Sequence, residues 1–260
     1  MKISECFKHL KEQKRVGLIV YITAGYPDIV FTEKFAEKLQ DAGVDMIEIG
    51  VPFSDPIADG PVIQQASQKA LENHTNMKAI MGLCCRLKQK LHIPYLLMSY
   101  YNPIYKYGLK KFADDCNVAN VSGVIVPDLP FEESQVLHKE LEKYGIDLIF
   151  FISVTTSEKR RKKILRHGSG FIYYIAVCGV TGTRDALPGY IYKDLSSLQK
   201  QSKIPVAVGF GISTESQIYR LKECSDAVII GSYVMKDIMS KSYNRILESL
   251  KNFHNILHKE

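Results

Sequence analysis

The stretch 45-DMIEIGVPFSDPIADGP-61 joins a short apolar run to a polar loop. The apolar run is typical of a buried strand, and the loop is rich in Asp, Pro and Gly, which favour turns. Glu48 stands between Ile47 and Ile49 inside the predicted strand. A buried carboxylate without a partner is costly, so its presence there requires a structural or a chemical reason.

Seven other apolar runs are followed in the same way by a turn and an amphipathic stretch. They are GLIVYIT from Gly17, PYLLMSY from Pro94, GVIVPD from Gly123, DLIFFIS from Asp147, FIYYIAV from Phe171, PVAVGFG from Pro205 and AVIIGS from Ala227. All are continuously hydrophobic rather than alternating, as expected for parallel strands covered on both faces. Eight strand-then-helix units in 260 residues predict a (β/α)8 barrel, which is an α/β fold.

An open, doubly wound sheet is the alternative fold for such a repeat. It usually carries a GxGxxG turn after its first strand, and the corresponding segment YITAGYPD lacks one. No linker or low-complexity segment interrupts the pattern, so residues 1–260 are predicted to form one barrel domain. Met1 to Arg15 is predicted to be a helix that caps the amino-terminal end of the barrel. Ser242 to Leu257 is predicted to be a terminal helix that docks through Ile246, Leu247, Leu250, Phe253 and Ile256.

Capping residues mark several predicted helix ends. Gly43 and Gly145 are expected just after two helices, because glycine adopts the left-handed backbone conformation at low cost. Ser213 is the expected N-cap of the helix after the seventh strand, since its hydroxyl can accept from a free backbone N–H.

The composition argues against several classes of protein. Hydrophobic residues make up 46% of the chain and the net charge is +6, which does not by itself require a nucleic-acid or membrane partner. No apolar signal segment or membrane-length run is present, so a cytoplasmic protein is expected. Six scattered cysteines without a CxxC pair indicate free thiols, and the seven histidines show no metal-ligand spacing.

The most basic segment is SEKRRKKILRHG, from Ser157 to Gly168. No aromatic residues interleave with its charges, and the net charge of the chain is moderate. We therefore interpret it as the solvated face of an outer helix rather than as a nucleic-acid surface.

In a barrel of this kind the active site lies at the carboxyl ends of the strands. The polar residues predicted at those ends are Thr23, Glu48, Asn102, Asp128, Ser153 and Thr155.

Two carboxyls, those of Glu48 and Asp59, come from one strand–loop unit. Glu48 could be a core residue in a salt bridge, and Asp59 could merely form the turn before Gly60. The functional interpretation is that apolar surroundings raise the pKa of Glu48, so that this carboxyl transfers protons near neutral pH. Because both carboxyls are expected to face one pocket, we favour acid–base catalysis.

Gly-rich turns follow the last three predicted strands, in CGVTGTRDALPG, GFGIS and IIGSYV. Barrels bind phosphate there, through backbone N–H groups and a helix N-terminus. The expected donors are Gly182, Gly211, Gly231 and Ser232, and the loop Gly179 to Gly189 is expected to be a mobile lid.

Several motifs together resemble the α subunit family of tryptophan synthase. They are EIGVPFSDPIADGPVIQQA, LMSYYNPI, VIVPDLPFEE, GVTGTR, VGFGIS and IGSYV, and the resemblance extends from about Phe7 to Leu257. It implies a lyase that cleaves indole-3-glycerol phosphate by retro-aldol chemistry to indole and glyceraldehyde 3-phosphate, in L-tryptophan biosynthesis. It also implies a β subunit partner in an αββα assembly. The β subunit holds pyridoxal phosphate, and no cofactor is expected in this chain.

The resemblance also implies roles for individual residues. Glu48 handles protons at indole C3 and at the glycerol hydroxyl, and Asp59, which stays ionised, accepts the indole N–H. The other implied substrate-binding residues are Tyr21, Met98, Ile125, Tyr173, Thr181, Gly182, Phe210, Gly211, Gly231 and Ser232. The segments Pro52 to Asp59 and Gly179 to Gly189 match loops that close over the substrate and meet the β chain. Asp55, Asn102 and Asp128 match positions that tie loops to strands or to the partner.

The chain departs from the family pattern at Ala176, Cys178 and Tyr233, which bears on lid ordering and coupling rather than on the two carboxyls. A related barrel, indoleglycerol phosphate synthase, would need a catalytic Lys at a strand end, and no predicted strand ends in one. A subunit that mainly activates a β partner, with little or no catalysis of its own, is the remaining alternative.

Overall fold

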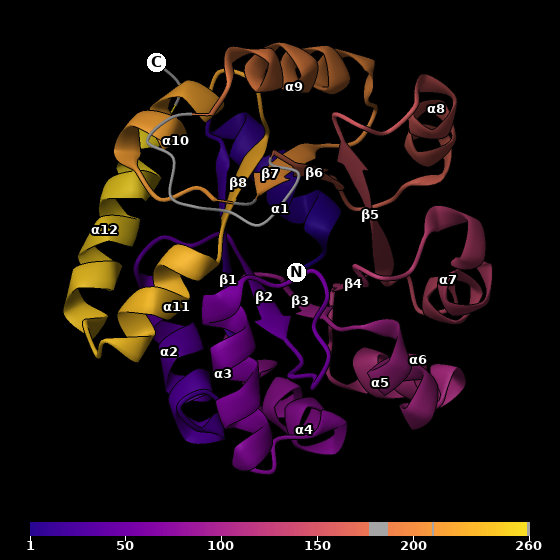
Figure 1. The fold of residues 1–260 in the computed structure, drawn as a ribbon, viewed down its shortest axis with the longest axis vertical. Coiled ribbons are helices and arrows are strands. Elements are labelled where there is room, and N and C mark those ends of the chain that lie inside the picture. The colour runs from indigo at the N-terminus through magenta and orange to yellow at the C-terminus, as the bar shows by residue number, and fades with distance from the viewer. Residues whose placement is uncertain (177–186, 210, 259–260) are drawn as a thin grey trace.

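The computed structural model describes residues 1–176, 187–209 and 211–258, and in this part parallel strands close into a barrel (Figure 1). Their order around the barrel is their order in the sequence, β1 to β8, and β8 pairs with β1. The strands are β1 (Gly17–Thr23), β2 (Met46–Gly50), β3 (Tyr95–Met98), β4 (Gly123–Ile125), β5 (Asp147–Ser153), β6 (Ile172–Ile175), β7 (Val206–Gly209) and β8 (Ala227–Ile230). Each lies within one of the eight predicted apolar runs, so the predicted (β/α)8 barrel is confirmed.

Helices surround the strands, as Figure 1 shows. They are α1 (Ile3–Glu12), α2 (Ile29–Asp41), α3 (Pro61–Glu72), α4 (Met77–Leu87), α5 (Tyr101–Tyr107), α6 (Leu109–Val118), η1 (Phe131–Glu133), α7 (Gln135–Glu142), α8 (Glu158–His167), α9 (Gly189–Gln201), α10 (Glu215–Leu221), α11 (Ser232–Met239) and α12 (Tyr243–Ile256). With helices outside and side chains filling the barrel inside, every residue of β1, β2, β3, β4, β7 and β8 is buried. This burial explains why these strands read as unbroken apolar runs.

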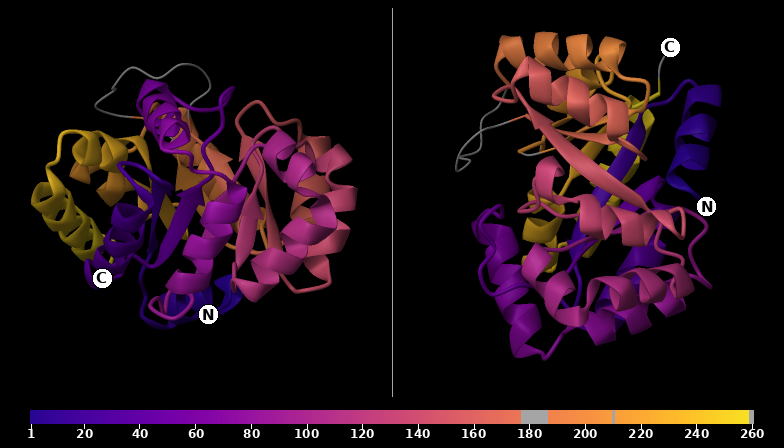
Figure 2. Two further views of the ribbon diagram at one scale, coloured as in Figure 1. Left: turned by 90° about the horizontal axis from the view of Figure 1, so that it is seen from below. Right: turned by 90° about the vertical axis from the view of Figure 1, so that its right-hand side faces the viewer.

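Helix α1 covers the amino-terminal end of the barrel, as predicted (Figure 2). Glycines at the start of two strands make room for it. A Cβ on Gly17 would lie 2.8 Å from Leu10, and a Cβ on Gly123 would lie 2.8 Å from Ile3. The Cys6 thiol also reaches the backbone oxygen of Asp45, at 3.5 Å, just before β2. The opposite end, which holds the carboxyl ends of the strands, is free of this helix and is where a barrel site is expected.

The last helix, α12, docks through Ile246, Leu250 and Phe253, which are buried. Near its end, His254 Nδ1 lies 2.7 Å from the Gly43 oxygen. Arg15, just before β1, forms a largely buried, two-pronged ion pair with Asp45. These contacts join segments near both ends of the chain to the segment before β2. They help to close the amino-terminal end of the barrel.

The capping predictions met different outcomes. Gly43 and Gly145 follow α2 and α7 with φ of +86° and +64°, which is the expected left-handed conformation. The predicted N-cap Ser213 is wrong. Thr214 caps α10, because its hydroxyl accepts from Gln217 N–H while the Gln217 side chain accepts from Thr214 N–H. Such a reciprocal box requires a spacing of three residues, which only Thr214 has to Gln217.

Candidate active site

Glu48 lies in the middle of β2, between the neighbouring residues Tyr21 of β1 and Leu96 of β3. Its side chain is fully buried. Among the described residues neither carboxyl oxygen has a hydrogen-bond partner. Burial therefore raises the pKa of Glu48 to about 8. The alternative of a core salt bridge has no support in the described part of the chain, and the carboxyl is left protonated near neutral pH.

Asp59 lies in the loop between β2 and α3 and is partly buried. Its Oδ2 accepts a hydrogen bond from the Tyr100 hydroxyl at 3.1 Å. Burial raises the pKa of Asp59, while the Tyr100 hydrogen bond acts in the opposite direction. The expected ionised state of Asp59 is thus opposed by desolvation and favoured by this one contact.

The loop that carries Asp59 is held at both ends. Its Ala58 N–H donates to the Tyr100 hydroxyl at 2.9 Å, and the Phe53 ring packs on the Tyr100 ring at 5.4 Å between centroids. Gln64 of α3 donates to the Asp59 backbone oxygen at 2.8 Å. Pro61 begins α3, where the missing N–H costs nothing. These contacts set where the carboxyl can point.

Two tyrosines, Tyr21 of β1 and Tyr173 of β6, are buried next to the carboxyls. Desolvation raises both tyrosine pKa values, and the charges of Glu48 and Asp59 raise them further. Each hydroxyl lies over a glycine. A Cβ on Gly50 would be 2.1 Å from the Tyr21 oxygen, and one on Gly209 would be 2.6 Å from the Tyr173 oxygen.

Met98 and Ile125, the other predicted wall residues, end β3 and β4 and are register partners. Both are buried. The structure therefore gathers the two carboxyls, the two tyrosines and this apolar pair within the carboxyl half of the barrel.

The predicted phosphate site is described only in part. Gly231 is the N-cap of α11 and Ser232 its first residue, so the free N–H groups of this helix start lie just beyond β8. Gly211 follows the adjacent strand β7 with φ of +77°, and a Cβ there would meet no atom within 4 Å. Thr181, Gly182 and Phe210, and the departure at Cys178, lie outside the described residues, as does most of the predicted lid.

The remaining strand-end residues serve local structure. Asp128 accepts from Tyr101 N–H at 2.8 Å, which anchors the start of α5. The Ser153 hydroxyl lies 2.8 Å from that of Thr155, and the Tyr21 hydroxyl 3.3 Å from that of Thr23. Asn102 is exposed on α5. Within the described segments none of these residues bonds directly to either carboxyl. Thr23 is linked to them through Tyr21, and the charge of Asp128 acts on Tyr100.

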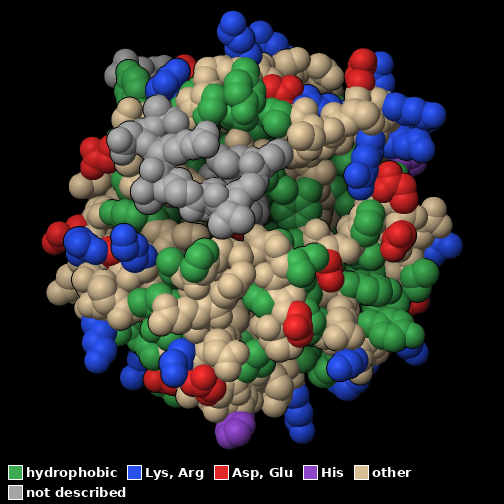
Figure 3. All heavy atoms as spheres, in the orientation of Figure 1, with side chains coloured by type: hydrophobic (Ala, Val, Ile, Leu, Met, Phe, Trp, Pro, Cys, Tyr) green, Lys and Arg blue, Asp and Glu red, His purple; other side chains and the backbone are tan. Residues whose placement is uncertain are grey.

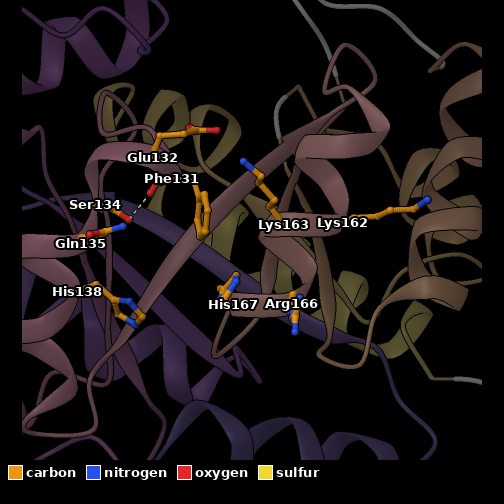
Figure 4. Close-up of a pocket in the computed structure, with 9 residues that line it drawn as sticks. All are labelled: Phe131, Glu132, Ser134, Gln135, His138, Lys162, Lys163, Arg166 and His167. Atoms are coloured by element: carbon orange, nitrogen blue, oxygen red, sulfur yellow. Dashed lines mark hydrogen bonds between the residues drawn. The ribbon is translucent and has the colours of Figure 1, made fainter.

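A hollow of about 550 Å³ lies elsewhere, on the outer surface between α7 and α8 (Figure 4). Its lining residues are Phe131, Glu132, Ser134, Gln135, His138, Lys162, Lys163, Arg166 and His167. Neither Glu48 nor Asp59 reaches it. The hollow belongs to the basic segment, which forms the exposed helix α8 as expected, and we assign it no part in the site.

Tyr100 is the site residue that the sequence reasoning missed. It stands in the motif LMSYYNPI, two residues beyond the end of β3. A phenol at a strand end of a barrel is a signal that could have been used, although the sequence does not show which loop it would touch.

No metal centre is found among the described residues, where no three His, Cys, Asp or Glu side chains could share an ion. In the same part of the chain no helix is long and apolar enough to span a membrane.

Comparison with known proteins identifies the family. A family model described as "Tryptophan synthase alpha chain" matches residues 7–259. The tryptophan synthase alpha chain of Geobacter sp. (strain M21) is 41% identical over 252 residues, which cover 97% of this chain and 94% of the relative. The chain belongs to the tryptophan synthase alpha chain family.

Other alpha chains agree with this assignment. The one from Citrifermentans bemidjiense is 42% identical over 97% of this chain and 94% of its own length. The solved structure of Mycobacterium tuberculosis tryptophan synthase superposes with a TM-score of 0.92 at 28% identity, covering 99% of this chain and 98% of that one. The alpha chain of Legionella pneumophila gives 0.87 at 30% identity, covering 99% and 96%. The resemblance noted in the sequence is confirmed.

Proposed function

We propose that this chain cleaves indole-3-glycerol phosphate to indole and glyceraldehyde 3-phosphate, as the alpha subunit of tryptophan synthase in L-tryptophan biosynthesis. One observation carries the proposal beyond family membership. Glu48 is fully buried, unpartnered among the described residues and has a pKa of about 8, and it lies near enough to Asp59 for both charges to act on Tyr21. A carboxyl in that state can both give and take a proton near neutral pH.

In the retro-aldol step Glu48 gives up one proton and takes one back, so its protonation state is the same before and after. Protonated Glu48 gives its proton to indole C3, which turns the ring into a leaving group with positive charge at the ring nitrogen. The resulting carboxylate then takes the proton of the glycerol hydroxyl as the C–C bond breaks and the aldehyde forms. Indole leaves with the bond electrons, and Glu48 is again protonated. The raised pKa suits this cycle, because the group begins and ends as an acid.

Asp59 has the complementary task. A carboxylate that accepts the indole N–H is stabilised as the ring becomes positive, so the interaction strengthens in the transition state. The partly buried position of Asp59 strengthens the attraction further, since water screens it less.

The remaining predicted residues hold the substrate. Tyr21, Met98, Ile125 and Tyr173 would bury the flat indole ring. The N-terminus of α11, with Gly231 and Ser232, and the open space beside Gly211 would hold the phosphate.

All the chemistry assigned to this chain is proton transfer by carboxyls, which requires no cofactor, and pyridoxal phosphate is assigned to the β partner alone.

A β subunit is the proposed partner, in an αββα assembly located in the cytoplasm. The end of the barrel opposite α1 supports a docking face. Ile57 in the β2–α3 loop and Tyr105 on α5 are 82% and 65% exposed there, although both are large hydrophobic residues. On this face Lys and Arg lie mostly at the edge, as Figure 3 shows. Because Ile57 is two residues from Asp59, docking on this loop would couple the partner to catalysis.

An assay of indole release from indole-3-glycerol phosphate tests the function, with purified chain alone and with cognate β subunit. We expect slow release alone and faster release with the partner. No release in either case would refute catalysis and favour a purely activating subunit, and equal rates would refute the coupling. The Glu48→Gln chain is the matched control for contaminating activity.

A further inference from the structure

We propose that Tyr100 is a positioning residue that holds Asp59 through its Oδ2 atom and leaves Oδ1 to receive the indole N–H. The inference rests on the proposed function and deepens it, since it states how the second carboxyl is aimed.

The hydrogen bonds of the Tyr100 hydroxyl fix their own direction. The Ala58 backbone N–H lies 2.9 Å away and can only donate, so it occupies an oxygen lone pair of the phenol. The phenol proton is therefore available to Asp59 Oδ2, at 3.1 Å. Among the described residues Asp59 Oδ1 has no such partner, so one of the two carboxylate oxygens stays open.

Tyr100 is itself held in place by two strands and a loop. Ser99 N–H continues the sheet by donating to the Ile125 oxygen at 3.0 Å, and Tyr101 N–H donates to Asp128 at 2.8 Å. The Tyr100 ring is buried, and Phe53 packs on it. Because the phenol is fixed at the end of β3, its hydrogen bonds restrict the β2–α3 loop and the side-chain rotation of Asp59.

The charges around the pair are consistent with this role. The hydrogen bond favours the ionised form of Asp59, against the effect of burial on its pKa. The titratable groups that face the pair from neighbouring elements are Tyr21 of β1, Glu48 of β2, Asp128 after β4 and Tyr173 of β6. None of them carries positive charge, so within the described residues Tyr100 is the main group that favours the carboxylate.

Tyr100→Phe tests the proposal, since it removes the hydroxyl and keeps the ring. Tyr95→Phe is the matched control. Tyr95 is a buried tyrosine of β3, the strand that leads to Tyr100, and its hydroxyl contacts the Cys84 and Ala119 oxygens on the helix side. We expect Tyr100→Phe to lower kcat by about 10- to 100-fold, the range for a hydrogen bond to a charged group. Tyr95→Phe should lower the melting temperature only, with kcat per folded molecule unchanged.

A direct measurement separates positioning from stability. The carboxyl ¹³C resonance of Asp59, assigned with Asp59→Asn, reports its pKa without turnover. In Tyr100→Phe that pKa should rise, and the acid limb of the kcat/KM profile should move to higher pH with it. An Asp59 pKa and a kcat equal to those of the parent would overturn the proposal.

The outcomes also separate this proposal from the proposed function. A parent chain that releases no indole refutes the function, while the Asp59 titration still decides the role of Tyr100. Should Tyr100→Phe not fold, replacing Tyr100 by 3-fluorotyrosine keeps the ring and the hydroxyl. Its more acidic hydroxyl is a stronger donor and should lower the Asp59 pKa, and an unchanged value would count against the proposal.

Discussion

Tyr21 of β1 and Glu48 of β2 are register partners, so a buried phenol and a buried carboxyl leave adjacent strands at the same level of the barrel. In a parallel pair such residues point to the same face of the sheet. The phenol cannot neutralise the carboxyl, and desolvation raises the pKa of both groups.

Glu48→Gln should lower kcat by about 10²–10⁴, the usual loss for one general acid–base group, while KM changes little. The amide keeps the shape and cannot transfer the proton. Glu33→Gln serves as a control, because Glu33 forms ion pairs with Arg86 and Lys90 on the outer surface. Indole release and melting temperature are measured on both variants. A Glu48→Gln chain that melts much earlier yet keeps its activity per folded molecule would assign Glu48 to structure instead.

Glu48 should also make stability depend on pH. Its pKa rises from 4.5 to about 8 on folding, so the folded state binds the proton more tightly. This contribution is fully present below about pH 4.5 and is lost as pH rises to about 8, up to roughly 4–5 kcal/mol. The free energy of unfolding of Glu48→Gln relative to the parent should therefore grow from pH 5 to pH 8. Chemical denaturation across this range measures it, and a constant difference would contradict a buried, unpaired Glu48.

The pH dependence of turnover should follow the same group. If protonated Glu48 starts the reaction, kcat/KM should fall as pH rises through about 8, tenfold for each further pH unit. Steady-state rates with indole-3-glycerol phosphate from pH 6 to pH 10 give the profile. A base limb that stays unchanged in Tyr95→Phe and is absent from the residual rate of Glu48→Gln would assign the limb to Glu48.

Asp59→Asn should lower kcat by about 10²–10³, because an amide cannot stabilise the positive indole ring as a carboxylate does. The substrate should still bind through its phosphate, so KM should rise less than kcat falls. Asp114→Asn offers a control away from the site, since Asp114 lies on α6 and its side chain is bonded to Tyr144. Comparable losses in both variants would point to a general loss of stability rather than to a specific role of Asp59.

Gly211→Asp should raise KM for the substrate strongly, by about tenfold or more, because it would place a negative charge beside the proposed phosphate site. The structure leaves room for the side chain, but the φ of +77° also strains any residue with a Cβ. Gly211→Ala isolates that strain, and Gly108→Asp carries a similar strain, at φ of +95°, away from the site. Equal KM values for the Asp and Ala variants at position 211 would show that the substrate phosphate does not bind beside Gly211.

The sequence was sufficient for the barrel, since unbroken apolar runs and glycine-ended helices are local signals. It was also sufficient to single out Glu48, because a carboxylate inside a buried strand breaks the pattern of its own neighbours. Tyr100 was harder to find, although β2 and β3 are consecutive strands. The way the β2–α3 loop folds over the end of β3 depends on tertiary contacts such as the hydrogen bond from Ala58 N–H to the Tyr100 hydroxyl, which the spacing of residues does not show.

The N-cap of α10 shows a second limit on what the sequence alone can predict. Ser213 and Thr214 are both good N-cap residues, and only the register of the helix selects the one three residues before Gln217. The ionisation of Asp59 is a third case, because burial of a loop residue depends on how the loop folds back. Local chemistry was predictable, whereas choices between neighbouring residues depended on tertiary contacts.

Gly50 and Gly209, which lie beneath the rings of Tyr21 and Tyr173, limit which substitutions the site can accept during evolution. Any side chain at position 50 would overlap the Tyr21 hydroxyl, and any at position 209 would overlap that of Tyr173. Ring carbons crowd these positions as well, at 2.4 Å for Tyr21 and 2.7 Å for Tyr173, so removing the hydroxyl alone is not enough. Each glycine can therefore be replaced only after its tyrosine has moved or has been replaced by a smaller residue. In a library of variants, substitutions at 21 and 50, and at 173 and 209, should survive as pairs and fail singly at the glycine, so mutational paths to a new substrate must pass through the tyrosine first.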